Sequence, residues 1–133
     1  MTEQRQRRSI LSGSPFEEKA GYARALVDGD LVYVSGTTGL DYATGTMSED
    51  IAEQAEQALR NIADALAEAG GTLADVVRVR YLLPDATEFE RCFPALWRAF
   101  GEIRPAATAM ICGLPDPRVK IEIEVDARLR HQA

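Results

Sequence analysis

The stretch that decides the fold is RPAATAMICGLPDPRVKIEIEVD, which covers residues 104–126. Two apolar runs flank the turn-forming residues 113–117, and this arrangement predicts two strands joined as a hairpin. The second run alternates between the two faces of a strand. One face takes Val119, Ile121, Ile123, Val125 and Ala127, and the other takes Lys120, Glu122, Glu124, Asp126 and Arg128. The three acids line either a solvated surface or a shared cavity, and the rest of the chain must decide between these alternatives.

Further strands are expected upstream of this stretch. The Asp28-Gly29 turn separates residues 22–26 from residues 31–36 and predicts another hairpin. Small residues at 36–39 let the backbone pass close to another segment, either as a plain loop or as the rim of a ligand site. Residues 76–83 read as a third strand, and residues 9–15 are a candidate edge strand. We expect residues 1–8 to be a flexible N-terminus and residues 9–133 to form a single domain.

Two helices are predicted between these strands. Ser48 is the expected start of the first, which should end after Ala69 at Gly70-Gly71. Its buried face has no evident chemical role and consists of Ile51, Ala55, Leu59, Ile62, Leu66 and Ala69. The second helix begins either at a capping box on Thr87 or at Pro94, which suits a first turn. Its apolar stripe is interpreted as core and consists of Phe89, Phe93, Leu96, Trp97 and Phe100.

The order strand, strand, helix, strand, helix, strand, strand predicts an α+β two-layer sandwich, one mixed sheet with two helices packed on one face. The other face of the sheet is left uncovered. In the third strand Val77, Val79, Tyr81 and Leu83 share one side, so Arg78, Arg80 and Leu82 fall on the opposite side. There the arginines would pair with the acids of the last strand if the two strands are neighbours. This charged face is either the solvated surface of a monomer or the inside of a closed ring of copies with polar grooves between subunits.

Composition limits the possible partners. A net charge of −6 and a pI near 4.8 argue against nucleic acid, which binds clustered Lys and Arg. Cys92 and Cys112 have no pair spacing, and His131 is the only histidine, so no metal site is expected. Two thiols without a disulfide framework suit a reducing compartment. Neither a leader segment nor a membrane-spanning apolar run is recognisable, so we expect a cytoplasmic protein without membrane contact.

Three segments together carry a resemblance to a known family: Val34-Ser35-Gly36, residues 104–108 (RPAAT) and residues 119–124 (VKIEIE). In this order and spacing they resemble the RidA family, the YjgF-like reactive-intermediate deaminases, over residues 21–129. The resemblance implies a chorismate-mutase-like fold, a homotrimer and three clefts at the subunit interfaces. It also implies hydrolysis of enamines and imines of 2-amino acids to ammonia and 2-keto acids, with no metal or organic cofactor.

The resemblance assigns site residues one position at a time. The catalytic tyrosine, serine and glutamate of the family fall on Tyr22, Ser35 and Glu122, and the glutamate positions or activates water. The arginine that binds the substrate carboxylate in the family is replaced by Ala107. The asparagine expected in the second helix falls near Phe93 or Pro94, and neither side chain can supply an amide.

Another arginine is a candidate to replace the missing one. Arg80 is the first choice because alternation places it on the same sheet face as Glu122, and Arg104 is the second. An Arg80 guanidinium paired with Glu124 would exclude the first choice. Thr108 is a further candidate contact, which would supply a hydroxyl or backbone donor to developing charge.

Three functions remain open at this stage. The first is a cofactor-independent hydrolase of small imines or enamines that works in inter-subunit clefts, with Glu122 as the base. The second is a binding or sensing protein that keeps the cleft for a small metabolite and has lost the chemistry. The third is the ribonuclease activity ascribed to some relatives, which the acidic composition and the single histidine disfavour.

Overall fold

The computed structural model describes residues 7–130. The expected N-terminal tail therefore lies largely outside the described residues, as does His131. Arg7 and Arg8, which we assigned to that tail, instead belong to strand β1 (Arg7–Ile10). They pair in register with Asp28 and Val27 of the next strand, so the sheet begins two residues earlier than expected.

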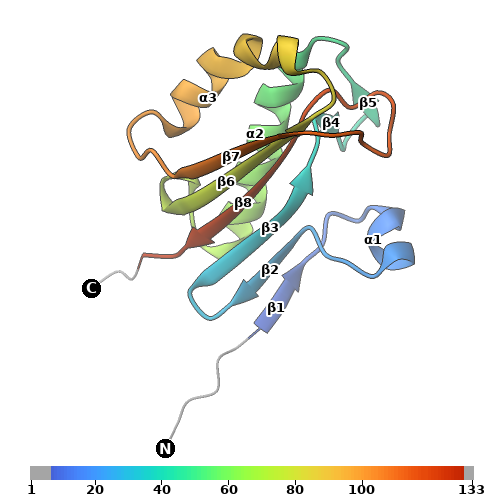
Figure 1. Cartoon of the computed structure of the whole chain (residues 1–133). Coiled ribbons are helices and arrows are strands. Elements are labelled where there is room, and N and C mark those ends of the chain that lie inside the picture. Colours follow the sequence, from blue (N-terminus) through green and yellow to red (C-terminus); the bar gives the residue numbers. More distant parts are fainter. Residues whose placement is uncertain (1–6, 131–133) are drawn as a thin grey trace, which may run out of the picture.

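Within the described residues the main sheet has the strand order β1-β2-β3-β8-β6-β7 (Figure 1). Its other strands are β2 (Ala25–Asp28), β3 (Leu31–Thr37), β8 (Glu122–Arg128), β6 (Val76–Leu83) and β7 (Ala106–Ile111). Helices α2 (Ile51–Ala69) and α3 (Phe93–Phe100) lie on the same side of this sheet (Figure 1). The α+β two-layer fold with one mixed sheet is thereby confirmed.

Smaller elements complete the chain. Helix α1 (Pro15–Ala20) lies beside β1, and a separate ribbon consists of β4 (Leu40–Asp41) and β5 (Thr46–Met47). Two 3₁₀ segments, η1 (Leu73–Asp75) and η2 (Ala86–Cys92), precede β6 and α3. The sequence analysis missed α1 and the ribbon because elements this short show little hydrophobic periodicity.

The hairpin expected around residues 113–117 is wrong. Strand β7 pairs with β6 in parallel, and β8 pairs with the opposite edge of β6 in the antiparallel sense. Residues 112–121 therefore carry the chain past the end of β6 instead of turning tightly between adjacent strands. The upstream hairpin is confirmed, but its two loop residues are Gly29 and Asp30, because Asp28 pairs with Leu31. Gly29 adopts φ 64°, a conformation in which glycine has no Cβ clash.

The alternation predicted for the last strand is confirmed. Its apolar face is buried, with Ile121, Ile123 and Val125 fully inaccessible to solvent. In β6 the prediction fails at Val77, which is 50% exposed. The register between β6 and β8 shifts between Val76 and Arg78. Such an irregularity breaks the alternation of side chains, so Val77 does not lie on the buried face with Val79.

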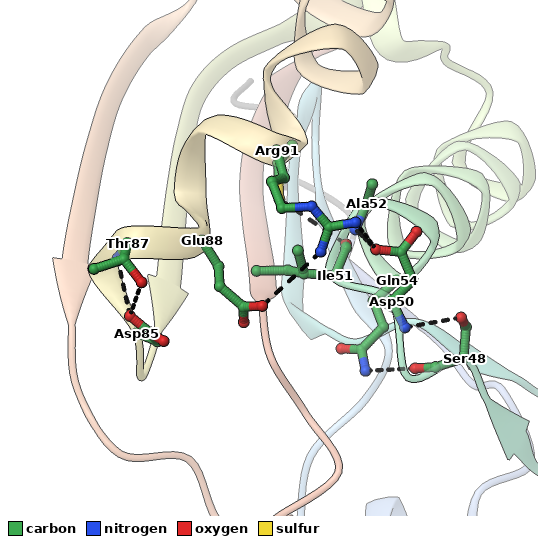
Figure 2. A network of polar contacts seen from close by, with 10 residues as sticks. Ser48, Asp50, Ile51, Ala52, Gln54, Asp85, Thr87, Glu88 and Arg91 are labelled. Atoms are coloured by element: carbon green, nitrogen blue, oxygen red, sulfur yellow. Dashed lines mark hydrogen bonds and ion pairs between the residues drawn. The ribbon is translucent and has the colours of Figure 1, made fainter.

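Helix α2 ends as predicted, because Gly70 adopts φ 94° and its N–H donates to the carbonyls of Leu66 and Ala67. The helix begins later than expected. Its N-cap is Asp50, whose carboxylate accepts from the Ala52 N–H, while the Ser48 hydroxyl accepts from the Asp50 N–H (Figure 2).

An arginine ties the start of α2 to the segment before α3. Arg91 of η2 forms ion pairs with Asp50 and with Glu88 (Figure 2). The N-cap of η2 is Asp85, so the capping box expected on Thr87 is wrong: the Thr87 hydroxyl and N–H instead both donate to Asp85. The short 3₁₀ run delays the regular helix until Phe93, with proline in its first turn.

The aromatic stripe of the second helix divides between core and surface. Phe100 is only 5% exposed, whereas Phe93 is 47% and Trp97 62% exposed. The prediction that the whole stripe is core is therefore wrong for Phe93 and Trp97. Both residues line a groove beside β7. Because β7 is the last strand at that edge of the sheet, no further strand of residues 7–130 covers Phe93 and Trp97.

Candidate functional site

The uncovered face of the sheet brings acids and arginines together across β6 and β8. Arg78, Arg80 and Leu82 of β6 lie opposite the acidic row of β8, Asp126, Glu124 and Glu122, as the sequence analysis predicts. The Arg80 guanidinium lies 3.3 Å from Glu124 and 3.6 Å from Asp126. Because its guanidinium is paired with Glu124 and Asp126, Arg80 is excluded as the arginine that would bind a substrate carboxylate in place of the family arginine.

The Glu122 side chain lies close to Gly36 of strand β3, although its backbone pairs in register with Leu82 of β6. A Cβ atom placed on Gly36 would lie 2.8 Å from the Glu122 Cδ and 2.9 Å from Oε2, so only glycine leaves room for the carboxylate there. The carboxylate is partly buried, and this burial raises its pKa above the ordinary glutamate value. The positive charge of Arg24 acts in the opposite direction and lowers that pKa, while the negative charge of Glu124 raises it.

Arg24 is the functional candidate that the sequence analysis missed. Its side chain is only 9% exposed, and its guanidinium donates to the Gly36 carbonyl at 2.6 Å and to the Tyr42 hydroxyl at 3.3 Å. Arg24 and Glu122 thus contact the same glycine, and Arg24 fixes the backbone beside the carboxylate. The sequence shows Arg24 only as an arginine directly before the apolar strand β2. Its proximity to Gly36 becomes visible only when β2 is paired with β3.

The two other expected catalytic residues lie near this point of the fold. The Ser35 hydroxyl donates to the Ala23 carbonyl at 2.7 Å, and the Ser35 N–H donates to the Arg24 carbonyl at 3.0 Å. Ser35 therefore fastens the start of β2 to β3. Tyr22 is 42% exposed, and among residues 7–130 no hydrogen bond joins it to Glu122.

The remaining candidates lie elsewhere in the chain. Phe93, Arg104 and Ala107 line a groove of about 410 Å³ between α3 and the β6–β7 edge, with Trp97 in the same wall. Ala107 pairs in register with Val79 of the buried face. Thr108 pairs with Arg80, so it belongs to the opposite face of the sheet. Within one chain the expected site residues therefore form two groups, one around Glu122 and one in the groove.

Comparison with known proteins decides the family. The model of a family described as Endoribonuclease L-PSP matches residues 13–129. The chain belongs to this family, the YjgF/RidA family. A crystal structure of a Mycobacterium tuberculosis member of the YjgF/YER057c/UK114 family has 42% identical residues and a TM-score of 0.85, and covers 93% of this chain and 100% of its own.

Other similar proteins are more distant in sequence from this RidA-family chain. An uncharacterized protein of Streptomyces coelicolor is 35% identical over 121 residues, or 90% of each chain. A Bos taurus protein named 2-iminobutanoate/2-iminopropanoate deaminase is 34% identical over 119 residues, or 86% of this chain and 87% of its own. The resemblance seen in the sequence is thereby confirmed.

In this RidA-family chain the resemblance leads us to expect an amide near Phe93 or Pro94 and a guanidinium at Ala107. Phe93 and Ala107 line the same groove, so both expected polar groups would belong to one connected surface.

Other chemistries find little support among the described residues. No group of three or more His, Cys, Asp or Glu side chains in residues 7–130 could hold a metal ion. Burial raises the pKa of the Cys92 thiol to about 11, which keeps it protonated and poorly nucleophilic at neutral pH. Over the same residues no helix is long and apolar enough to cross a membrane.

Proposed function

We propose that this protein is a cofactor-independent hydrolase of small imines or enamines, with Glu122 as the group that activates water. The observation that carries the proposal is the Glu122 carboxylate, partly buried against Gly36 and beside the buried Arg24. Burial raises the pKa of this carboxylate above the ordinary glutamate value, which makes it a stronger base than an exposed glutamate. The names of the bovine and human relatives, which are imine deaminases, support this reaction type.

The reaction needs only water and one carboxylate. As the water oxygen adds to the imine carbon, Glu122 accepts one of the water protons and passes it to the imine nitrogen, which gives a neutral carbinolamine. Glu122 then takes the hydroxyl proton and delivers it to the amine nitrogen, so the carbon–oxygen double bond forms as the C–N bond breaks and ammonia leaves. The sum is imine plus water giving a carbonyl compound plus ammonia, so no oxidant or metal is required.

The proposal includes a homotrimer whose clefts join the two groups of site residues. All the residues of β7 are exposed, and this strand forms one edge of the sheet beside the groove. In the assembly the groove of one subunit forms one wall of a cleft, and Glu122 of the partner subunit forms the other. Ser35 and Tyr22 accompany that glutamate, while Thr108 lies on the β7 edge.

A cytoplasmic location belongs to the same proposal. Cys92 and Cys112 are both free thiols, which suits a reducing compartment. The substrate would accordingly be a reactive intermediate of intracellular amine chemistry.

The test measures ammonia release from freshly generated imines by wild type, Glu122→Gln and Glu124→Gln. Glu124 is the matched control because it lies on the same strand face but pairs with Arg80. We expect Glu122→Gln to lose at least about a hundredfold in rate, since general-base catalysis contributes about 10²–10⁴, and Glu124→Gln to keep most activity. Equal rates for all three proteins would reject the hydrolase and favour the second candidate, a metabolite-binding protein, which the apolar Ala107 supports.

The family description also names an endoribonuclease. The net charge of −6 gives no basic surface for RNA, so we expect no cleavage of single-stranded RNA. Cleavage that survives in Glu122→Gln would show that a different site acts on RNA.

A further inference from the structure

Strand β3 is irregular at the point where the Glu122 carboxylate lies against it. Its register with β8 shifts between Val34 and Thr37, so Gly36 lies at a break in the ladder of paired strands. Regular strand pairing does not fix the backbone at such a break. Other contacts must hold Gly36 in place if the carboxylate beside it is to keep one position.

Arg24 supplies these contacts through both its main chain and its side chain. Its carbonyl accepts from the Ser35 N–H at 3.0 Å, and its guanidinium donates to the Gly36 carbonyl at 2.6 Å. The guanidinium also donates at 3.3 Å to the hydroxyl of Tyr42, which directly follows β4. Because one planar group makes both side-chain bonds, the guanidinium has a defined orientation beside the break in the ladder.

The burial of Arg24 favours a role for its charge as well. The residue is only 9% exposed, and its Nε is the only buried side-chain nitrogen or oxygen without a hydrogen-bond partner between residues 7 and 130. No carboxylate among those residues forms an ion pair with it. A neutral donor could bond the Gly36 carbonyl with a smaller desolvation penalty. The backbone contact therefore explains a donor at this position but does not explain a cation.

The groups around Glu122 show what the charge acts on. Burial raises the pKa of Glu122, the positive charge of Arg24 lowers it, and the negative charge of Glu124 raises it. Arg80 on the neighbouring strand β6 is already paired with carboxylates. The residues of β3 and β6 that adjoin Glu122 in the sheet are uncharged, namely Gly36, Thr37 and Leu82. Arg24 is thus the positive charge that favours the ionised form of Glu122.

We propose that Arg24 is a positioning residue for Glu122: it holds the Gly36 backbone against the carboxylate, and its buried charge keeps that carboxylate in the ionised form that accepts a proton. Burial alone would favour the protonated form, which cannot act as a base. Arg24 therefore extends the activity of the hydrolase to lower pH. The inference rests on the proposed function for its effect on the rate, whereas the coupling of Arg24 to Glu122 is measurable without any substrate.

The coupling is tested by NMR of the Glu122 carboxyl carbon as the pH is changed, with Glu122→Gln to assign the signal. Arg24→Gln keeps a donor for the Gly36 carbonyl but removes the charge, so the pKa of Glu122 should rise above its wild-type value. Arg128→Gln is the control, because it removes the same charge from the far end of β8 and should leave the Glu122 titration unchanged. An unchanged or lower Glu122 pKa in Arg24→Gln overturns the inference.

The pH dependence of kcat/KM for imine hydrolysis separates the two parts of the role. In Arg24→Gln the acid limb should move to higher pH, so the loss of rate should be larger at low pH than at high pH. Arg24→Lys keeps the charge but lacks the planar fork, so it should lose about tenfold at every pH, since small displacements at a site can cost about a hundredfold. An equal loss at all pH values in Arg24→Gln overturns the charge role.

The conservative variant also keeps the test decisive if Arg24→Gln does not fold. Full wild-type activity of Arg24→Lys at every pH overturns the positioning role. If the pKa of Glu122 rises in Arg24→Gln but Glu122→Gln hydrolyses imines as fast as wild type, the coupling stands and the hydrolase is rejected. If hydrolysis depends on Glu122 but Arg24→Gln leaves its titration and the pH profile unchanged, Arg24 has only a structural role and the inference fails.

Discussion

Gly36, near the end of strand β3, and Gly39, just after that strand, have different neighbours, and each position gives a specific prediction. A Cβ on Gly36 would meet the end of the Glu122 side chain, whereas a Cβ on Gly39 would lie 2.6 Å from the Cα of Gln54 in helix α2. A side chain can move aside, but a helix backbone cannot do so without moving the packed core.

We therefore expect Gly36→Ala to fold within about 1 kcal/mol of wild type and to lose at least tenfold in hydrolysis, since small displacements at a site can cost about a hundredfold. Gly39→Ala should lose about 2–3 kcal/mol through overpacking. Urea unfolding and the imine assay measure the two effects. A Gly36→Ala protein that keeps full activity would show that the position of the Glu122 carboxylate does not matter.

The pKa of Glu122 predicts how stability varies with pH. Burial raises this pKa in the folded chain, so ionised Glu122 opposes folding at neutral pH, and the opposition disappears as the pH falls below the ordinary glutamate value of 4.5. Glu122→Gln cannot ionise, and it should raise the thermal midpoint at neutral pH and lose that gain below this value. Glu124→Gln should show no such gain because it loses the ion pair with Arg80. A Glu122→Gln protein that is less stable than wild type at neutral pH would contradict the direction of the pKa shift.

At the scale of elements, the buried Gln54 side chain joins helix α2 to residues 118–120, which lead into strand β8. Gln54 is fully buried; its amide donates to the carbonyls of Ser48 and Arg118, and its oxygen accepts from the Lys120 N–H. These bonds position the residues that lead directly into Glu122. The sequence analysis assigned this helix face no polar role, because a single glutamine among alanines does not reveal which backbone groups it will meet.

Gln54→Met keeps the side-chain length but removes the partner of three partly buried backbone groups, the Ser48 and Arg118 carbonyls and the Lys120 N–H. We expect a loss of about 1–3 kcal/mol in total, because an unsatisfied group costs about that much when it is fully buried and these groups keep partial access to water. Hydrogen exchange of the Lys120 amide should also become faster. Gln57→Met, one turn later, is the control because the hydrogen bonds of Gln57 go to the side chains of Asn61 and Arg60. Similar losses in both variants would mean that the Gln54 network contributes little.

At the scale of the whole molecule, the oligomeric state decides whether the proposed clefts can form. The proposed clefts need two subunits, and β7 exposes Met110 and Ile111 at 41% and 55%. We expect sedimentation at micromolar concentration to give three times the chain mass of 14.6 kDa.

Ile111→Asp should shift the protein toward smaller species, because it places a charge in the proposed subunit contact. Leu11→Asp is the control, since Leu11 is 63% exposed and follows β1 at the opposite edge of the sheet. A wild-type particle with the mass of one chain would reject the trimer and the shared cleft together.

The features that could be predicted from the sequence are local ones. Strict alternation placed Ile121, Ile123 and Val125 in the core and Glu122 on the open face, and Gly70 ended α2 as expected. These features depend on periodicity and on backbone preferences of single residues, which act over a few positions. The three segments that carried the family resemblance also lie within short stretches.

Contacts between residues far apart in the chain could not be predicted from local patterns and became visible in the folded chain. The insertion of β6 between β7 and β8 separated two strands that looked like a hairpin, and the same order put Ala107 and Glu122 on different sides of the sheet. The pairing of β2 with β3 brought Arg24 to Gly36 and hence to Glu122, which no local pattern indicated. Strand order and burial depend on the packing of the whole chain, since they are set by contacts between residues far apart in sequence.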